Sequence, residues 1–172
     1  MLKRDYDQTC SVARSLEVLG ERWTLLVIRD VFHGKRRFDE IQENLGVARN
    51  VLATRLTRLV AEGILEKRPY QDRPTRYEYF LTEKGIDLWP VMITMMHWGD
   101  RYLADEGPPV VIHHKDCGGG VDDRGYCERC GERLTARDAY AEGVPGLDAA
   151  PAPRRATITS RKLGSNRPSR AG

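Results

Sequence analysis

Apolar residues recur at helical spacing in four segments of the first 62 residues, namely 10–19, 23–32, 38–45 and 49–62. Apolar side chains at positions i, i+3, i+4 and i+7 share one face of an α-helix, so each segment predicts an amphipathic helix. A glycine follows each segment within two residues and is expected to end the helix. The segment 23–32 is the most apolar, and we therefore expect it to be largely buried.

The pattern changes after residue 63, where it predicts a β-hairpin. Residues 64–70 and 75–81 favour strands, and the second of these alternates in polarity and is rich in aromatic residues. Residues 71–74, Gln-Asp-Arg-Pro, favour the connecting turn. The tip of this hairpin is therefore expected to be polar and basic.

A long apolar segment follows the hairpin. Thr82 is expected to cap a helix over 83–105, and Pro90 to kink this helix or split it in two. The apolar residues cover more of the helix than one core-facing stripe requires. We therefore expect part of the helix to lie at or beside a two-fold interface, the alternative being a helix that lies wholly within the core of one chain. The residues expected at the interface are Trp89, Met92, Met96 and Trp98.

Composition and charge narrow the class of protein. The 172 residues are 40% hydrophobic and 31% charged, which is a globular balance. No apolar run approaches the roughly 18 residues of a membrane span, and the charged N-terminus lacks the apolar stretch of a secretory signal. We therefore expect a cytoplasmic protein that does not enter a membrane. The net charge of +3 divides into +1 over residues 1–105, −4 over 106–148 and +6 over 149–172, which predicts a short basic tail.

Two short helices separated by Gly46 and followed by a hairpin are the parts of a winged helix-turn-helix. On the helix 49–62 the leucines form one narrow apolar face, Asn50 and Thr54 lie opposite, and Arg49 and Arg55 lie on the flanks. Such amide, hydroxyl and guanidinium groups can read base edges and hold phosphates in a major groove. The hairpin tip can reach a minor groove. The side chains expected to contact double-stranded DNA are Arg36, Arg37, Arg49, Asn50, Thr54, Arg55, Arg58, Arg73 and Arg76.

Other functions are weighed against DNA binding. The polar helix face could be ordinary solvated surface, and the winged helix could bind protein without specific DNA binding, but the basic hairpin tip argues against this alternative. A zinc-dependent hydrolase would need a carboxylate or histidine beside an open metal position, and the sequence offers no such constellation. We therefore predict a sequence-specific regulator of transcription and not an enzyme.

Four stretches of the chain resemble HxlR-type transcriptional regulators. They are CSVARSLEVLGERWTLLVIRD at 10–30, RFDEI at 37–41, VLATRL at 51–56 running into EGIL at 62–65, and RYEYFLTEKG at 76–85. The resemblance covers about residues 8–105. It implies a mainly α fold with a small β-hairpin wing (α+β), and a DNA-binding homodimer that represses or activates transcription. It names no effector, so a small molecule and an oxidant both remain open as signals.

The sequence departs from this family just before the predicted recognition helix. The family often has Ser or Thr followed by Pro, whereas this chain has Ala48 and Arg49. The missing side-chain cap is expected to cost this helix about 1 kcal/mol. Asn50 also replaces a common basic residue, so we expect the operator sequence to differ from that of better-known members.

Three cysteines and a histidine lie at the spacing of a small zinc ribbon. Cys127-x2-Cys130 places two thiolates on one turn, and His114 stands at the same spacing from Cys117. His113 is the alternative ligand, and three reduced cysteines without metal are the alternative to a metal site. So short a module cannot fold by burial alone, which favours a structural zinc ion.

The sequence thus predicts three parts: a winged helix-turn-helix with its dimerisation helix over 8–106, a zinc-ribbon-like module over 110–140 and a disordered basic tail over 143–172. The first two share no obvious apolar surface and are expected to have separate cores.

One cysteine lies apart from the module. Cys10 begins the first predicted helix, where the helix N-terminus and Arg14 can acidify its thiol. Some members of the resembled family sense electrophiles or oxidants through a cysteine in this region. A redox sensor and a small core residue are the two interpretations of Cys10.

Overall fold

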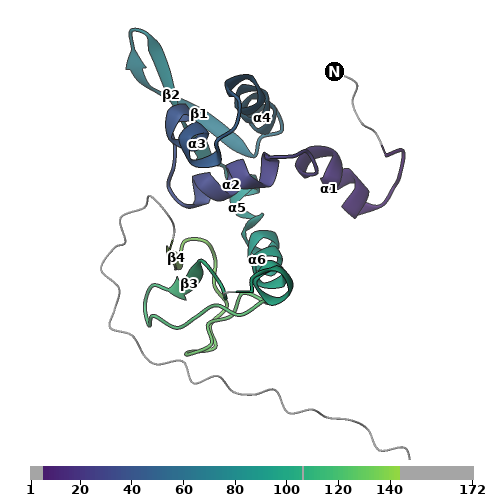
Figure 1. Cartoon of the computed structure of the whole chain (residues 1–172), viewed down its shortest axis with the longest axis vertical. Helices are drawn as coiled ribbons and strands as arrows, with labels where there is room; N and C mark the ends of the chain where they lie inside the picture. The colour runs from purple at the N-terminus through teal and green to yellow at the C-terminus, as the bar shows by residue number, and fades with distance from the viewer. Residues whose placement is uncertain (1–5, 106, 144–172) are drawn as a thin grey trace, which may run out of the picture.

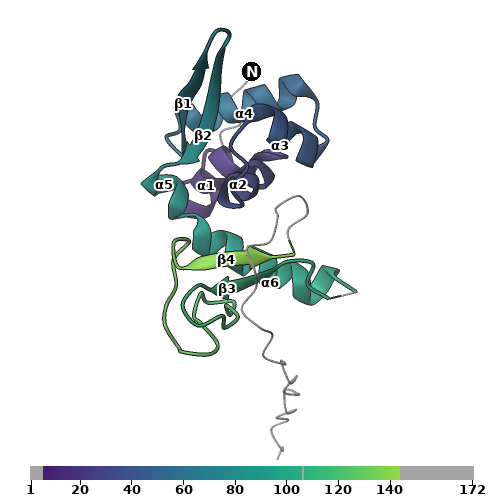
Figure 2. The same ribbon diagram turned by 90° about the vertical axis from the view of Figure 1, so that its left-hand side faces the viewer.

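The computed structural model describes residues 6–105 and 107–143, which form a winged helix-turn-helix joined to a small β-containing module (Figures 1 and 2). The helices are α1 (Ser11–Leu19), α2 (Thr24–Phe32), α3 (Phe38–Leu45), α4 (Arg49–Ala61), α5 (Glu83–Ile86) and α6 (Trp89–Leu103). The strands are β1 (Leu65–Asp72), β2 (Thr75–Leu81), β3 (Val111–His114) and β4 (Ala139–Glu142). Strands β1 and β2 form one antiparallel sheet and β3 and β4 another. The predicted fold class, mainly α with a β-hairpin wing, is confirmed.

The first four predicted helices are present, and their ends follow from glycine. Gly46 follows α3 with φ of 60°, and Gly63 follows α4 with φ of 68°. A side chain is strained in this left-handed region, which glycine adopts freely. The N–H of Gly46 donates to the carbonyl of Gln42 at 2.9 Å, so the reversal also satisfies the end of α3. This turn sets α3 and α4 as the two helices of the helix-turn-helix.

The hairpin is tighter than the sequence predicts. Strand β1 continues to Asp72, which pairs with Thr75, so Arg73 and Pro74 alone make the loop. The register shifts between Pro69 and Gln71, where the proline has no N–H to give to the ladder. Figures 1 and 2 both show the hairpin projecting from the helices at the end of the molecule away from the β3–β4 sheet.

The predicted long helix is split, as the position of Pro90 indicates. Pro90 lies in the first turn of α6, where its missing N–H has no helical partner to lose. Thr82 caps α5, because its hydroxyl oxygen accepts from the N–H of Gly85 at 3.2 Å. The same hydroxyl donates to the carbonyl of Gly63 at 2.6 Å. A Cβ on Gly85 would lie 2.3 Å from the carbonyl oxygen of Ile64, so only glycine lets α5 pack this closely against the base of the hairpin.

Two hydrophobic cores support these elements. The first is formed by α2, α3, α4 and β1, and it includes Val27, Ile28, Ile41, Leu52, Leu56, Leu59 and Leu65. The second joins Trp89 and Ile93 of α6 to residues of the cysteine-containing module, namely Ile112, Val121, Cys127 and Leu134. Phe32 packs against both cores. The expectation that the module shares no apolar surface with the winged helix is therefore wrong, because α6 buries one face against it.

Two further sequence expectations concern the C-terminal tail and the membrane. The predicted tail over 143–172 lies outside the described residues, apart from Gly143. Within residues 6–105 and 107–143, no helix combines the length and the apolar composition needed to cross a membrane.

Candidate nucleic-acid interface and metal centre

Helix α4 presents a polar face to solvent at its N-terminal end. Ala48 precedes the helix in an extended conformation and offers no side-chain cap, as the sequence indicates. The side-chain oxygen of Asn50 accepts from the N–H of Val51 at 2.9 Å, and the hydroxyl of Thr54 donates to the carbonyl of Asn50 at 2.9 Å. Both side chains are exposed. The leucines of α4 are buried on the other side, so this exposed face is free for a ligand such as a base edge.

Arg55 does not lie on an open flank of α4, and this part of the sequence prediction is wrong. The residue is 8% exposed, its Nε donates to the carbonyl of Arg22 at 3.0 Å, and its Nη2 binds Oε2 of Glu21 at 2.8 Å. Arg58 is half-buried and donates to the carbonyl of Glu17. Both guanidinium groups therefore fasten α4 to α1 and to the α1–α2 loop.

The basic segment before α3 is tied to the hairpin. Nε of Arg37 donates to Oε1 of Glu78 at 3.0 Å, and this carboxylate raises the pKa of Arg37. The guanidinium of Arg37 lies 4.6 Å from the ring centroid of Tyr70, and that of Arg36 lies 4.6 Å from the ring centroid of Phe80. These contacts hold both cations beside β1 and β2, where they extend the basic surface of the hairpin.

The start of α3 is also fixed by an acidic side chain. Oε2 of Glu40 accepts from the N–H groups of Arg36 and Arg37 at 3.0 and 2.9 Å. The Arg37 N–H is the main reason why the pKa of Glu40 lies below its ordinary value. The carboxylate is therefore ionised at neutral pH and holds the first turn of the helix-turn-helix in place.

The remaining predicted cations are exposed. Arg73 and Arg76 lie at the tip of the hairpin, and Arg49 lies at the first turn of α4, where its Nη1 is 3.3 Å from Oδ1 of Asp39. The structure adds two cations on β1 that the sequence analysis passed over, Lys67 and Arg68, whose charged groups lie over the rings of Tyr77 and Phe80. Both lie in the exposed middle of β1, and the charged run Glu66-Lys67-Arg68 was the signal that could have placed them on the hairpin surface.

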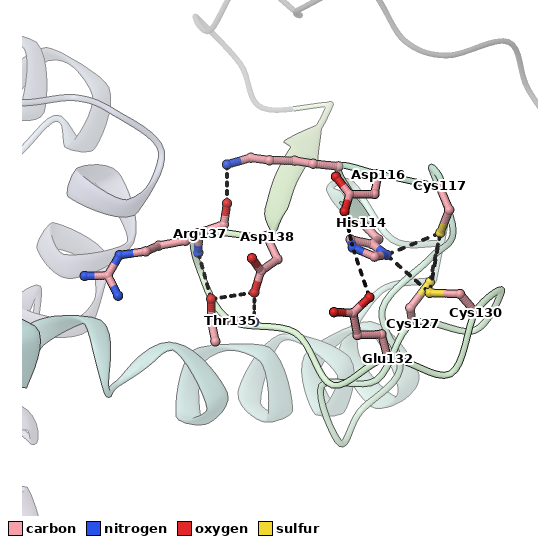
Figure 3. A network of polar contacts seen from close by, with 10 residues as sticks. His114, Asp116, Cys117, Cys127, Cys130, Glu132, Thr135, Arg137 and Asp138 are labelled. Atoms are coloured by element: carbon pink, nitrogen blue, oxygen red, sulfur yellow. Dashed lines mark hydrogen bonds and ion pairs between the residues drawn. The ribbon is translucent and has the colours of Figure 1, made fainter.

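The cysteine module brings its four predicted ligands together (Figure 3). The Sγ atom of Cys117 lies 3.3 Å from Nδ1 of His114, 3.3 Å from Sγ of Cys127 and 3.8 Å from Sγ of Cys130. Nδ1 of His114 lies 3.4 Å from Sγ of Cys130, and all four donor atoms lie within 4.8 Å of one another. Sulfur atoms bound to one tetrahedral zinc ion at 2.3 Å stand about 3.8 Å apart. The cluster therefore has the donors and the size to hold a metal ion.

The two histidines have different roles, because successive residues of β3 point to opposite faces. His114 is 3% exposed, and its Nε2 lies 3.8 Å from Asp116 Oδ2 and 3.9 Å from Glu132 Oε2. Carboxylates beside the second nitrogen of a ligating histidine orient the ring. His113 instead places Nε2 3.1 Å from Oε2 of Glu142 and stacks on Tyr140. His114, and not His113, is thus part of the cluster.

The turn from Cys127 to Cys130 favours thiolate. Burial opposes ionisation of the Cys127 thiol, but the N–H groups of Cys130 and Arg129 stabilise its charge and lower the pKa to about 6. The chain also leaves no room for a side chain here, since a Cβ on Gly119 would lie 2.6 Å from Sγ of Cys127. A thiolate is the form in which cysteine binds metal ions.

Comparison with known proteins agrees with the winged helix-turn-helix. Residues 18–107 match the family described as HxlR-like helix-turn-helix. The chain belongs to that family. An uncharacterised HTH-type transcriptional regulator of Mycobacterium tuberculosis (strain ATCC 25618 / H37Rv) is 47% identical to this HxlR-like chain over 140 residues, which cover 81% of the chain and 89% of the relative. That match is longer than the family segment.

Solved structures extend the comparison of the HxlR-like chain. PA1607, described as a candidate transcription factor, has a TM-score of 0.62 and 37% identity, and the match covers 77% of this chain and 93% of that one. The redox regulator HypR in its oxidised form has a TM-score of 0.50 and 32% identity, covering 54% of this chain and 96% of that one. These proteins are described as a transcriptional regulator, a transcription factor and a redox regulator. The chain is accordingly a DNA-binding regulator of transcription, as predicted.

The HxlR-like chain exposes large apolar side chains on α1 and on α6, here called the exposed apolar surface of these helices. Val12 is 66% exposed on α1, and Trp98 and Tyr102 are 57% and 62% exposed on α6, with ring centroids 5.6 Å apart. Val91, Met95, Leu103 and Leu16 are also exposed. Trp89 is only 7% exposed, because it lies in the second core. Trp89 is thus buried within one chain and Trp98 is exposed, and the two-fold interface predicted at or beside them stays a prediction.

Cys10 of the HxlR-like chain stands immediately before α1 and is exposed. The N–H groups of Ala13 and Val12 stabilise its thiolate and lower the pKa of the thiol. The lowered pKa thus results from the position of Cys10 at the helix N-terminus. Because Cys10 is exposed, its interpretation as a small core residue is wrong. The thiol lies beside Val12, which belongs to the exposed apolar surface.

Proposed function

We infer that the chain acts as a homodimer that binds a specific DNA operator, with α4 in the major groove and the β1–β2 hairpin against the backbone. The observation that carries this inference is the exposed polar face of α4 beside a basic hairpin. Asn50 and Thr54 offer an amide and a hydroxyl for base edges, while Arg73 and Arg76 offer charge that every duplex attracts. Arg55 and Arg58 are left out, because their guanidinium groups are held within the chain.

Two double variants separate specificity from general affinity in a gel-shift assay with the DNA upstream of the protein's own gene. Arg73→Ala/Arg76→Ala should weaken binding to all duplexes and reduce the slope of log affinity against log salt by about 1 for each lost phosphate contact. Asn50→Ala/Thr54→Ala should lower affinity for the operator by about 1–3 kcal/mol per lost base contact and leave nonspecific binding unchanged. The two variants act as controls for each other.

The assigned DNA contacts would be contradicted if both variants folded and bound the operator with the affinity and salt dependence of the wild type. Contacts with DNA would then lie elsewhere. A protein without operator binding in any form would instead favour the protein-interaction alternative.

The exposed apolar surface of α1 and α6 supports the homodimer. Large exposed apolar side chains mark candidate interaction surfaces, since burial of each stabilises a complex by about 1.5–3 kcal/mol. One helix-turn-helix covers one half-site, and a two-fold axis supplies the second. The same α6 that presents Trp98 outward buries Trp89 inward, so the dimer surface rests directly on the second core.

The cysteine module supports a structural zinc ion held by His114, Cys117, Cys127 and Cys130. Zinc bound by four protein ligands supplies folding free energy and no open position for catalysis. The module's own residues prepare the site: β3 orients His114, and the N–H groups of Cys130 and Arg129 stabilise the Cys127 thiolate. The metal would thus brace the face of α6 opposite to Trp98.

Cys10 is proposed as an oxidant sensor, and a structural neighbour is described as a redox regulator. Its lowered pKa increases the thiolate fraction at neutral pH, and thiolate is the nucleophile that attacks peroxides and quinones. Mild oxidant should release the operator from wild type but not from Cys10→Ser, as measured by gel shift. Zinc content must be followed in the same samples, because oxidation of the metal-site thiols could also release DNA. Equal release from both proteins, with zinc retained, would contradict a sensing role.

A further inference from the structure

A cavity lies between α6, the C-terminal end of α2 and the β3–β4 sheet. Its volume is about 580 Å³, which is within the roughly 300–1,000 Å³ of small-molecule sites. The cysteine module forms one wall, and the helix that leads into the DNA-binding half forms another. The cavity is thus separate from the metal ligands and from the exposed face of α4.

The lining of the cavity is suited to an aromatic molecule. Met92, Met95 and Met96 all line it, and they are three of the four methionines in the chain. Methionine side chains adapt to irregular shapes and their sulfur atoms interact favourably with aromatic rings. Trp89 and Phe32 add flat aromatic surface.

The charged residues of the lining, Arg29 and Asp100, carry opposite formal charges, so the lining has no net charge and favours an uncharged ligand. Burial lowers the pKa of His33, and the nearby Arg29 charge lowers it further, so its imidazole is neutral at pH 7. Burial likewise raises the pKa of Tyr140, which keeps the phenol neutral. The guanidinium of Arg29 is already paired, since its Nε and Nη2 donate to Oδ1 of Asp30 at 3.1 and 2.8 Å. His33 and Tyr140 can therefore donate and accept hydrogen bonds without attracting an ion.

We propose that this cavity is the effector site of the regulator and binds an uncharged aromatic molecule between α6 and the β3–β4 sheet. The proposal rests on the proposed function, because an effector has meaning only for a regulator. It assigns the cysteine module a role beyond support of α6: its β-sheet closes the ligand cavity.

The structure also provides a route from the cavity to the helix-turn-helix. Asp30, which pairs with Arg29 at the cavity wall, is fully buried and accepts from Nδ2 of Asn44 in α3 at 2.8 Å. Phe32 lines the cavity and packs against both cores. A ligand that moves Arg29 or Phe32 therefore changes how α2 holds α3. If the ligand binds one arrangement of α2 and α3 more tightly than another, it favours that arrangement and so alters the affinity for DNA.

The site can be tested with N-phenyl-1-naphthylamine, a neutral aromatic probe that becomes fluorescent in apolar surroundings. Gly99 in α6 lines the cavity, and a Cβ there would meet no atom within 4 Å. Gly99→Phe should therefore fill the cavity with its own ring, while Gly99→Ala is the matched control. Wild type and Gly99→Ala should bind the probe saturably, with one site per chain. Gly99→Phe should bind it at least about tenfold more weakly while keeping the metal and the operator affinity of the free protein.

Several outcomes would overturn the proposal. Equal binding by Gly99→Phe would place the probe elsewhere. A Trp98→Glu substitution places a charge on the exposed apolar surface of α6 and is expected to give monomers. Saturable probe binding by this variant but not by wild type would mean that a second copy of the chain fills the cavity. A saturating probe that leaves the operator affinity of wild type unchanged would show that the cavity is not coupled to DNA.

The proposed function fails differently from the cavity. If the protein bound no operator but the probe still distinguished Gly99→Phe from Gly99→Ala, the ligand site would stand and the regulatory inference would fall. If operator binding were intact but wild type bound no probe, the cavity assignment alone would be wrong.

Discussion

Replacing Cys127 with serine is expected to remove the metal and to unfold the module that follows α6. Cys127 is 2% exposed in the second core and provides one of four clustered donor atoms. A serine hydroxyl is a poor zinc ligand, and structural zinc contributes on the order of 10 kcal/mol to the folding of so small a unit. Metal analysis should give about one zinc per wild-type chain and close to none for Cys127→Ser. Limited proteolysis should then cut the variant within 107–143.

The chain offers matched controls for this result. His114→Ala should lose the metal as Cys127→Ser does, whereas His113→Ala should keep it, because His113 faces Glu142 and Tyr140 on the other side of β3. Cys10→Ser should also keep the metal, since Cys10 stands before α1. Freshly purified, reduced wild type without zinc, and with residues 107–143 still protected from protease, would contradict a structural metal.

Loss of the metal should also expose the buried side of α6. Trp89 and Ile93 would lose the module that buries them, so tryptophan fluorescence should shift towards that of exposed indole. The first core contains no residue of the module and should remain folded. Operator binding is expected to weaken through the loss of support for the dimer surface on α6.

Replacing Trp98 with glutamate is expected to convert the dimer into monomers. Trp98 is exposed in one chain, but in a dimer built on α1 and α6 its indole would be buried, and an unpaired carboxylate there would be strongly unfavourable. Light scattering should give the mass of one chain. Operator affinity should fall by about 100-fold or more, because the second half-site is no longer bound by a linked partner.

Trp98→Phe is the matched control, since it keeps an apolar ring at the same place and should remain a dimer. Tyr126→Glu tests for a general effect of an added charge, because Tyr126 is exposed on the cysteine module and not on α6. Trp98→Glu that stays dimeric and binds the operator as wild type does would place the interface on another surface.

Periodicity predicted the helices, the hairpin and the split at Pro90, because each depends on local spacing and on glycine or proline. It failed for Arg55, which lies about 140° from Asn50 around α4 and so borders the apolar face. Whether such a side chain turns outward or inward depends on its neighbours. Here Glu21 and the carbonyl of Arg22 approach from the α1–α2 loop, and only the tertiary arrangement brings them there.

For the metal site and the dimer surface too, the sequence alone did not decide which residues make which contacts. Spacing predicted the three cysteines, but either His113 or His114 could follow from it, and the strand β3 decides between them by alternation. The many apolar residues of α6 indicated that the helix contacts both a core and a partner chain, but not which residue makes which contact. Trp89 turned inward because the module supplies a core for it, while Trp98 remained exposed.

The packing of α5 has a consequence for the length of the operator. Gly85 lies against the carbonyl of Ile64, and Thr82 is bonded to Gly63, so the single turn of α5 is held firmly to the base of the hairpin. In a dimer joined through α6, this junction sets the separation and the angle between the two recognition helices. One extra base pair between half-sites rotates one of them by about 34° around the duplex axis. A stiff α5 cannot follow that rotation, and the regulator would discriminate among operators by their spacing as well as by their bases.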